Sequence, residues 1–312
     1  MKAIGITEFG GPDALRFVEL PDPQAGPGQL RIRVVAAAVN PTDTALRSGA
    51  RADLLREVPP PYVPGMDVAG VLDQIGDGVA TGLRVGDHVM AIVLPIGSHG
   101  AYAQHVVVPA ESVVKAPAGA TDVEAATLPM NGLTARLALD LLALRLGQHL
   151  AITGAAGAVG GYAVQLAKAD GLTVVADASP ADEELVRQLG ADSVVPRGDQ
   201  YAEHVRSVLP DGVDGLVDAA LLDSRAVGAV RDGGRIATVR GYRGDEERGI
   251  TFHPVQVRDY ALERGKLDRL RQQVETGQIT LRVAQTFPAD HAADAHRALE
   301  AGGIRGRFVL EF

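Results

Sequence analysis

Glycines spaced three residues apart follow an apolar run in the middle of the chain. Gly154, Gly157 and Gly160 lie in the segment HLAITGAAGAVGG, residues 149–161, which predicts a strand, a tight loop and a helix. A dinucleotide pyrophosphate requires bare backbone at a helix N-terminus, where N–H groups and the helix dipole attract its negative charge. The pattern G-x-x-G-x-x-G therefore predicts a dinucleotide site, with a ligand-free tight turn as the alternative. The residues expected to contact the cofactor are Gly154, Ala155, Ala156, Gly157, Ala158 and Val159.

A second set of polar residues lies about 20 positions further on, where dinucleotide-binding folds distinguish NAD from NADP. Asp177 could accept hydrogen bonds from a ribose diol and would repel a 2′-phosphate, which favours NAD. Ser179 could donate to a phosphate, and Arg197 could supply a positive charge. Asp177 or Ser179 could equally cap the next helix, and Arg197 could be a solvated surface residue. The residues alone therefore leave the choice of cofactor open.

The elements that must position these residues fall into two stretches of the chain. Residues 1 to about 120 contain short alternating or β-branched runs separated by Gly and Pro clusters, which predicts a partly open β-barrel. From about residue 122, apolar strands alternate with helices, and repeated βαβ units predict a parallel sheet covered on both faces. A long helix is expected near residues 259–275. The strand, helix and strand expected over residues 281–312 could complete either domain.

Composition and charge narrow the function classes. The 312 residues suffice for two domains, and 46% hydrophobic with 22% charged residues is typical of a soluble globular protein. No apolar run reaches the roughly 18 residues of a membrane helix, and the N-terminus lacks a signal-peptide pattern, so we expect a cytoplasmic protein. The absence of cysteine excludes disulfides and thiolate metal sites. A net charge of −9 without a basic block argues against nucleic-acid binding.

Several short motifs also occur in a fixed order along the chain. They are residues 38–43 (AVNPTD), 64–70 (PGMDVAG), 84–89 (RVGDHV), 100–104 (GAYAQ), 132–135 (GLTA), the glycine loop and 306–310 (GRFVL). Through these motifs the whole chain resembles the zinc-independent quinone oxidoreductase branch of the medium-chain dehydrogenase/reductase superfamily. The resemblance implies a GroES-like barrel domain over residues 1–120, completed by about 280–312, and a Rossmann NAD(P)-binding domain over residues 121–279. It also implies a cofactor in the cleft between the domains and a homodimer.

Zinc-dependent members of this superfamily carry a cysteine and a histidine in two of these motifs, where this chain has Asn40 and Met66. A metal site built from His88, His99 and His105 is conceivable, but we interpret these histidines as surface or packing residues. We therefore predict an enzyme without zinc, in which no Lewis acid polarises a carbonyl.

The resemblance further implies roles for residues around the cofactor. Members with a segment similar to residues 174–179 favour NADPH, with Ser179 and Arg197 near the 2′-phosphate, although Asp177 stands where those members often carry threonine. NADPH is therefore expected over NADH. At the nicotinamide end, Asn40 is expected to bond the cofactor ribose or the acceptor, and Thr134 the carboxamide.

Asp43 and Tyr62 complete the candidate catalytic residues together with Asn40. The resemblance places Asp43 near the nicotinamide, but an aspartate three residues after Asn40 also suits the start of a helix. Tyr62 is a candidate proton donor, with packing in its proline-rich loop as the alternative, since the tyrosines common in relatives are replaced by Ala45 and Arg51. The expected reaction is hydride transfer from NADPH to a quinone or related conjugated carbonyl. The alternatives are an NADPH-dependent enone or enoyl C=C reductase and a non-catalytic NADPH-binding protein.

Overall fold

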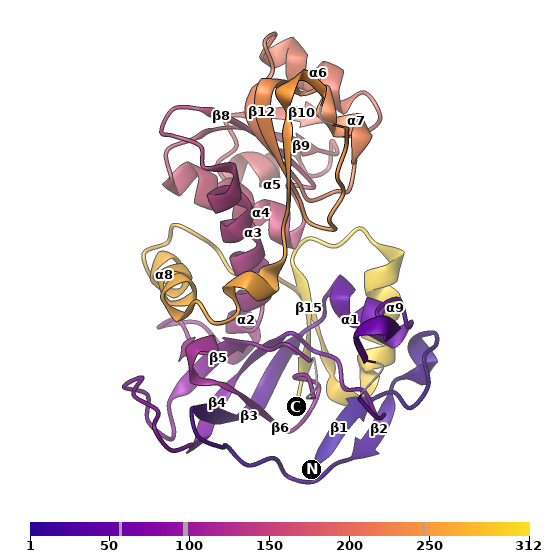
Figure 1. Ribbon diagram of the computed structural model, residues 1–312, viewed down its shortest axis with the longest axis vertical. Coiled ribbons are helices and arrows are strands. Elements are labelled where there is room, and N and C mark those ends of the chain that lie inside the picture. Colours follow the sequence, from indigo (N-terminus) through magenta and orange to yellow (C-terminus); the bar gives the residue numbers. More distant parts are fainter. Residues whose placement is uncertain (56–57, 96–98, 246) are drawn as a thin grey trace. The chain divides into compact units, whose positions relative to one another are not determined.

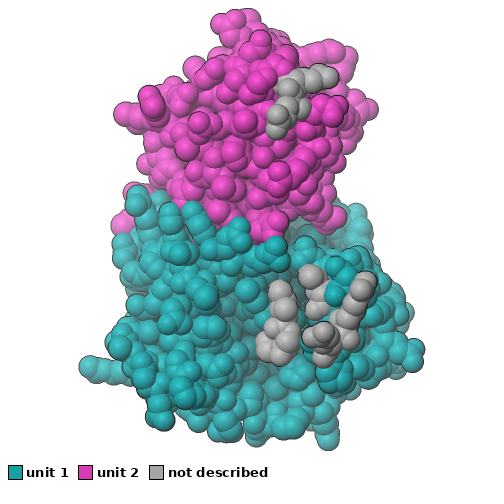
Figure 2. All heavy atoms as spheres, in the orientation of Figure 1, with its two compact units in different colours: residues 1–130, 258–275, 281–312 teal, residues 131–257, 276–280 magenta. Residues whose placement is uncertain are grey.

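The structure is a computed structural model that describes residues 1–312 except 56–57, 96–98 and 246. Its residues group into two compact units, which Figure 2 draws in two colours. Unit 1 comprises residues 1–130, 258–275 and 281–312, and unit 2 comprises residues 131–257 and 276–280. Compared with the boundaries expected from the sequence, residues 121–130 and 258–275 belong to the first unit instead of the second.

Unit 2 is built on a six-stranded parallel sheet in the order β10-β9-β8-β11-β12-β13. The strand order reverses between β8 and β11, which is the topological switch point of a Rossmann fold. The last five residues of β9 are all buried, as expected for a parallel sheet covered on both faces. The predicted Rossmann sheet is therefore confirmed. The strands are β8 (His149–Thr153), β9 (Thr173–Ala178), β10 (Ser193–Pro196), β11 (Val213–Asp218), β12 (Val230–Thr238) and β13 (Thr251–Pro254).

Helices alternate with these strands along the chain (Figure 1). The helix α4 packs against β8 and β9, and α6 packs against β10 and α7. Tyr201 and Val205 of α6 join Val195 and Leu216 in a buried apolar core. The helices whose residues lie in unit 2, wholly or for the most part, are α3 (Pro129–Leu142), α4 (Ala158–Ala169), α5 (Glu183–Gln188), α6 (Tyr201–Val208) and α7 (Ser224–Val227).

Unit 1 contains a seven-stranded sheet in which β15 and β3 pair in antiparallel fashion, with Val309 opposite Ala38. Figure 1 shows this C-terminal strand among the strands of the N-terminal part, so the tail completes the sheet of unit 1. The sheet runs β14-β15-β3-β4-β5-β7, with β6 also on β3, and a separate pair joins β1 and β2. The strands are β1 (Lys2–Gly5), β2 (Arg16–Glu19), β3 (Gln29–Ala38), β4 (Asp67–Ile75), β5 (His88–Ile92), β6 (His105–Pro109), β7 (Val113–Lys115), β14 (Val283–Pro288) and β15 (Arg307–Glu311).

In residues 1–130 the helices are short, because β-branched runs dominate this stretch of the sequence, and the longer helices of unit 1 lie in its later segments. The helices of unit 1 are α1 (Pro41–Arg47), α2 (Asp122–Ala125), α8 (Arg264–Glu275) and α9 (Ala292–Ala301). Single 3-10 turns occur in both units at Pro12–Ala14, Ala52–Leu55, Ala110–Ser112, Glu247–Gly249, Val257–Tyr260 and Ala289–His291.

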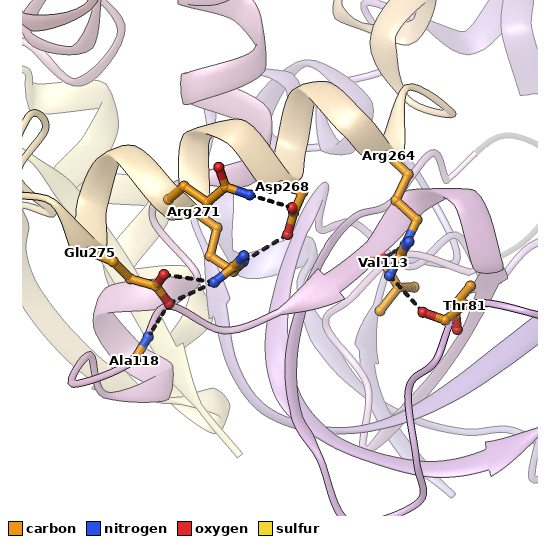
Figure 3. A network of polar contacts seen from close by, with 8 residues as sticks. Thr81, Val113, Ala118, Arg264, Asp268, Arg271 and Glu275 are labelled. Carbon is orange, nitrogen blue, oxygen red and sulfur yellow. Dashed lines mark hydrogen bonds and ion pairs between the residues drawn. The ribbon is translucent and has the colours of Figure 1, made fainter.

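The helix α8 shows why one domain boundary differs from the expectation (Figure 3). Arg264 donates from Nε to the Val113 carbonyl at 3.0 Å and from Nη2 to the Thr81 carbonyl at 3.1 Å. At the other end of the helix, Glu275 Oε1 accepts the Ala118 N–H at 2.8 Å. These three partners all belong to unit 1, so α8 is fastened to that unit at both ends. The helical periodicity that predicted α8 contains no information about which sheet it packs on.

Among the residues that the structure describes, no helix has both the length and the apolar character needed to span a membrane.

Candidate functional site

The glycine loop connects β8 to α4, as its sequence predicted, and two of its glycines are there for different steric reasons. Gly154 has φ +66°, a backbone conformation that side chains rarely adopt. Gly160 lies in α4, where a Cβ would stand 2.2 Å from the carbonyl oxygen of Gly154. Gly154 therefore makes the turn, and Gly160 lets the helix pack directly on the loop.

The N-terminus of α4 carries no side-chain cap. Its N-cap residue is Gly157, with φ −74° and ψ 179°, and the first turn contains no acidic residue. A helix end whose own first turn supplies neither a side-chain cap nor an acidic residue presents backbone N–H groups and the positive end of the helix dipole. Backbone of this kind at a helix N-terminus is a typical binding site for anions such as a pyrophosphate.

Side chains from both neighbouring strands fasten the loop. Asp177 of β9 accepts the Ala155 N–H on Oδ1 at 3.1 Å. On the other side, Thr153 donates from Oγ1 to Asp218 Oδ1 at 2.6 Å and accepts the Ala220 N–H at 2.9 Å. Since Thr153 and Asp218 pair across β8 and β11, this contact lies at the switch point, where Rossmann folds bind their ligands.

The three residues considered for the second phosphate lie near the carboxyl ends of β9 and β10. Asp177 is only 5% exposed, and burial raises the pKa of its carboxyl, against hydrogen bonds from the glycine loop and the charge of Arg197. Ser179 donates from Oγ to Asp182 Oδ2 at 2.5 Å, in a turn that precedes α5. Arg197 is exposed, and its N–H donates to the Ala178 carbonyl at 3.2 Å. Ser179 is thus bonded to Asp182, the N-cap residue of α5, and is not itself the N-cap.

Asn40 and Asp43 meet at the start of α1 in unit 1. Asp43 Oδ2 accepts the Asn40 N–H at 2.8 Å, and the two residues form a capping box around Pro41 at the first helical position. The other oxygen, Oδ1, accepts the Gly65 N–H at 2.9 Å. Asp43 therefore starts the helix and also ties it to Gly65, just before β4.

Asp67, which the sequence analysis did not single out, holds the side chain of Asn40. Its Oδ2 accepts from Asn40 Nδ2 at 2.6 Å, and its Oδ1 accepts the Met130 N–H at 2.6 Å. Both Asn40 and Asp67 are fully buried. The available signal was an acidic residue inside the motif PGMDVAG, because a carboxylate at the start of a buried strand needs partners.

Tyr102 and His296 extend this cluster, which we call the acid cluster and define as Asn40, Asp43, Asp67, Tyr102 and His296. Tyr102 OH lies 3.3 Å from Asp43 Oδ2 and 3.2 Å from His296 Nε2. Burial raises the pKa of Asp43 to about 6 and that of Asp67 to about 7, against their hydrogen bonds and the charge of nearby Arg307. Burial also lowers the pKa of His296 to about 3, so the imidazole is neutral.

Tyr62 and Thr134 lie outside the acid cluster. The Tyr62 ring stacks on Phe9, with ring centroids 5.4 Å apart and planes within 3°, and its backbone pairs with Ile6. This is the packing arrangement considered as the alternative for Tyr62. Thr134 lies in α3 and is 6% exposed.

Two of the three histidines considered as metal ligands have separate partners. His88 Nδ1 lies 3.0 Å from Asp122, and His105 Nε2 lies 3.4 Å from Asp73. Within residues 1–55, 58–95, 99–245 and 247–312, no group of three or more His, Cys, Asp or Glu side chains is arranged to hold a metal ion.

Two family models match the chain. The alcohol dehydrogenase GroES-like domain matches residues 26–118, and the zinc-binding dehydrogenase domain matches residues 189–310. The first match covers Asn40 and Asp67, and the second covers the later strands of the Rossmann sheet together with the C-terminal tail.

Individual relatives cover nearly the whole chain. It is 32% identical over 321 residues to the chloroplastic NADPH-dependent alkenal/one oxidoreductase of Arabidopsis thaliana, which spans 99% of this chain and 79% of that protein. It is 30% identical over 332 residues to the quinone oxidoreductase of Mus musculus, with 99% and 97% covered. A mycobacterial protein solved in complex with NADPH superimposes with a TM-score of 0.88 at 30% identity, with all of both chains covered. The chain therefore belongs to the medium-chain dehydrogenase/reductase superfamily and is an oxidoreductase of the quinone oxidoreductase-like type.

Proposed function

We propose that the protein transfers a hydride from NADPH to a quinone or a related conjugated carbonyl compound, without zinc. The observation that carries this proposal is the glycine loop, which leads into a helix without a side-chain cap at the switch point of a parallel sheet. The nicotinamide supplies the hydride when bound, and a proton from solvent or a side chain completes the reduction of a quinone to a hydroquinone. The protein orients the cofactor and keeps the reacting atoms dry.

The preference for NADPH is part of the proposal. A relative named as NADPH-dependent and a similar structure solved with NADPH support it. Arg197 is exposed and can offer its charge to a 2′-phosphate, with Ser179 as a second expected contact. Residues 154–159 are expected to hold the pyrophosphate, and Thr134 the carboxamide.

Asn40 is the residue of unit 1 that we expect to contact the cofactor ribose or the acceptor. Asp67 fixes its amide nitrogen and Asp43 binds its backbone N–H, so Asn40 is held in one orientation. Preorganisation of this kind reduces the reorganisation needed at the moment of reaction. Asp43 contributes by positioning Asn40, and Tyr62 remains a candidate proton donor.

Enone or enoyl C=C reduction is the second candidate. The relative from Arabidopsis thaliana is named for alkenal and enone substrates, and hydride delivery to an enone β-carbon demands a similar approach of the nicotinamide. We also propose that the protein acts in the cytoplasm and forms a homodimer. Light scattering of the purified protein will test the homodimer.

Titration with NADPH and with NADH, followed by nicotinamide fluorescence, tests the proposal. We expect sub-millimolar binding of NADPH and weaker binding of NADH. Turnover with a panel of quinones and enones then separates the two acceptor classes. Binding without any turnover would favour the non-catalytic alternative, and a folded protein that binds neither nucleotide would contradict the proposal.

A further inference from the structure

Asp177 occupies the position at the end of the second Rossmann strand where an acidic residue commonly bonds the ribose diol of NAD. In this chain its carboxylate is almost completely buried and its Oδ1 accepts the N–H of Ala155, the second residue of the glycine loop. The hydrogen bond joins residues that are 22 positions apart. The side chain is thus directed at the protein's own loop.

We propose that Asp177 is a positioning residue for the glycine loop and does not select between NADH and NADPH. This inference rests on the proposed function, because it concerns how the same site holds its nucleotide. It assigns to Asp177 a role that its residue type and position alone do not suggest.

The loop is fastened on two sides, and Asp177 provides one of them. On the β11 side, Thr153 joins Asp218 and the Ala220 N–H, and a Cβ at Gly154 would come within 3.3 Å of the backbone of residues 219 and 220. On the β9 side, the carboxylate of Asp177 accepts the Ala155 N–H. Loss of that carboxylate therefore removes this contact from the part of the loop that leads into α4.

The carboxylate of Asp177 also has polar partners within the protein. Burial raises the pKa of the carboxyl, and the N–H groups of Ala155 and Gly154 and the charge of Arg197 oppose that shift in part. A hydrogen bond from a backbone N–H to a charged acceptor is among the stronger kinds. This hydrogen bond holds the carboxylate toward the loop, so turning it toward a ribose hydroxyl would break a strong contact.

Two substitutions at this residue separate positioning from selection. Asp177→Ala removes the acceptor, and we expect NADPH and NADH to bind about tenfold more weakly, with the ratio of their dissociation constants unchanged within threefold. Asp177→Asn keeps an oxygen for the Ala155 N–H but removes the charge. We expect this variant to restore both affinities to near the wild-type values, and the KM for NADPH to follow them without a change in kcat.

Asp192→Ala is the matched control. Asp192 Oδ2 accepts the Val174 N–H at 2.7 Å, so it fastens the opposite end of the same strand, far along β9 from the glycine loop. We expect this variant to lower the unfolding temperature while leaving nucleotide affinity within twofold of the wild type.

The results have distinct meanings. If Asp177→Asn shifts the ratio of affinities toward NADPH by tenfold or more, Asp177 reads the ribose and the inference is wrong. Unchanged affinities in Asp177→Ala would likewise overturn it. If Asp177→Ala does not fold, the ratio of the NADPH and NADH dissociation constants of Asp177→Asn still shows whether Asp177 selects between them. A wild-type protein that binds neither nucleotide overturns the proposed function first, and that result is visible before any variant is made.

Discussion

The N-termini of α1 and α4 begin in opposite ways. At α1 the carboxylate of Asp43 binds the Asn40 N–H and closes a capping box, so the helix end is satisfied by the protein itself. At α4 the N-cap is Gly157, with no side-chain cap, and Asp177 binds Ala155 of the loop before the helix. A helix end that is closed serves stability, whereas one that is left without a carboxylate is suited to a negatively charged ligand.

The same comparison applies to the loops that these aspartates hold. Asp43 fastens Gly65, where a Cβ would stand 2.7 Å from the Ala101 nitrogen and from the Tyr102 ring, so protein fills the space around that loop. At Gly157 a Cβ would meet only the Gly154 carbonyl oxygen, at 3.1 Å. Similar residues therefore build a packed junction in unit 1 and a candidate ligand site in unit 2.

An acidic N-cap introduced at α4, like the capped start of α1, should have the largest effect, which is on NADPH affinity. Gly157→Asp places a carboxylate at the N-cap, where it satisfies the helix and repels a pyrophosphate. We expect NADPH to bind about 1,000-fold more weakly, or ~4 kcal/mol, because like charges brought together at a binding site cost several kcal/mol. Fluorescence titration measures the loss.

Gly157→Ala is the control for that variant, since it adds the same Cβ without the charge. We expect it to lose less than tenfold in affinity. Equal losses in the two variants would mean that the added Cβ, and not the charge, causes the loss of NADPH affinity. That result would contradict the contrast drawn between the two helix ends.

The acid cluster of unit 1 predicts that stability depends on pH. Since burial raises the pKa of Asp67 to about 7 and that of Asp43 to about 6, the folded protein holds these protons more tightly than the unfolded chain does. The resulting stabilisation is complete below the unfolded pKa and is lost as the pH rises through about 6 and 7. At about 1.4 kcal/mol for each pKa unit, we expect the free energy of unfolding to fall by several kcal/mol between pH 4 and pH 8 on this account.

Asp67→Asn isolates this contribution, because an amide cannot ionise. Urea unfolding at several pH values should give a smaller slope for this variant than for the wild type. If the free energy of unfolding depends on pH in the same way for the two proteins, the pKa of Asp67 is not raised by folding.

Removing the capping carboxylate of α1 should lower the free energy of unfolding by a smaller amount. Asp43→Ala leaves the N–H groups of Asn40 and Gly65 without their acceptor, and we expect a loss of about 2 kcal/mol in the free energy of unfolding. Asp43→Asn, which keeps one acceptor oxygen, should lose less. An Asp43→Ala protein as stable as the wild type would contradict the role given to this cap.

The smallest effect is expected at Tyr62. Tyr62→Phe keeps the ring that stacks on Phe9, so turnover should stay within about twofold of the wild type. General acid catalysis typically contributes 10²–10⁴-fold, so a loss of about 100-fold in kcat would identify the hydroxyl as the proton donor.

The sequence by itself determined the glycine loop and the strand and helix on either side of it. It also indicated the parallel sheet around them. These features depend on neighbouring residues: an apolar run, glycines at fixed spacing and the helical pattern after Gly157 are all local. The helix start at Asn40 and Asp43 was readable for the same reason, since a capping box spans only four residues.

Only the tertiary structure decided what the aspartates do. Asp67 binds Met130, 63 residues away, and Asp177 binds Ala155, 22 residues away, and neither partner can be inferred from spacing. The same holds for α8, whose periodicity predicted a helix but whose contacts with Val113 and Ala118 place it in unit 1. The physical reason is that burial and hydrogen-bond partners are set by which distant segments the fold brings together, whereas local conformation is set by the residues next to one another in the chain.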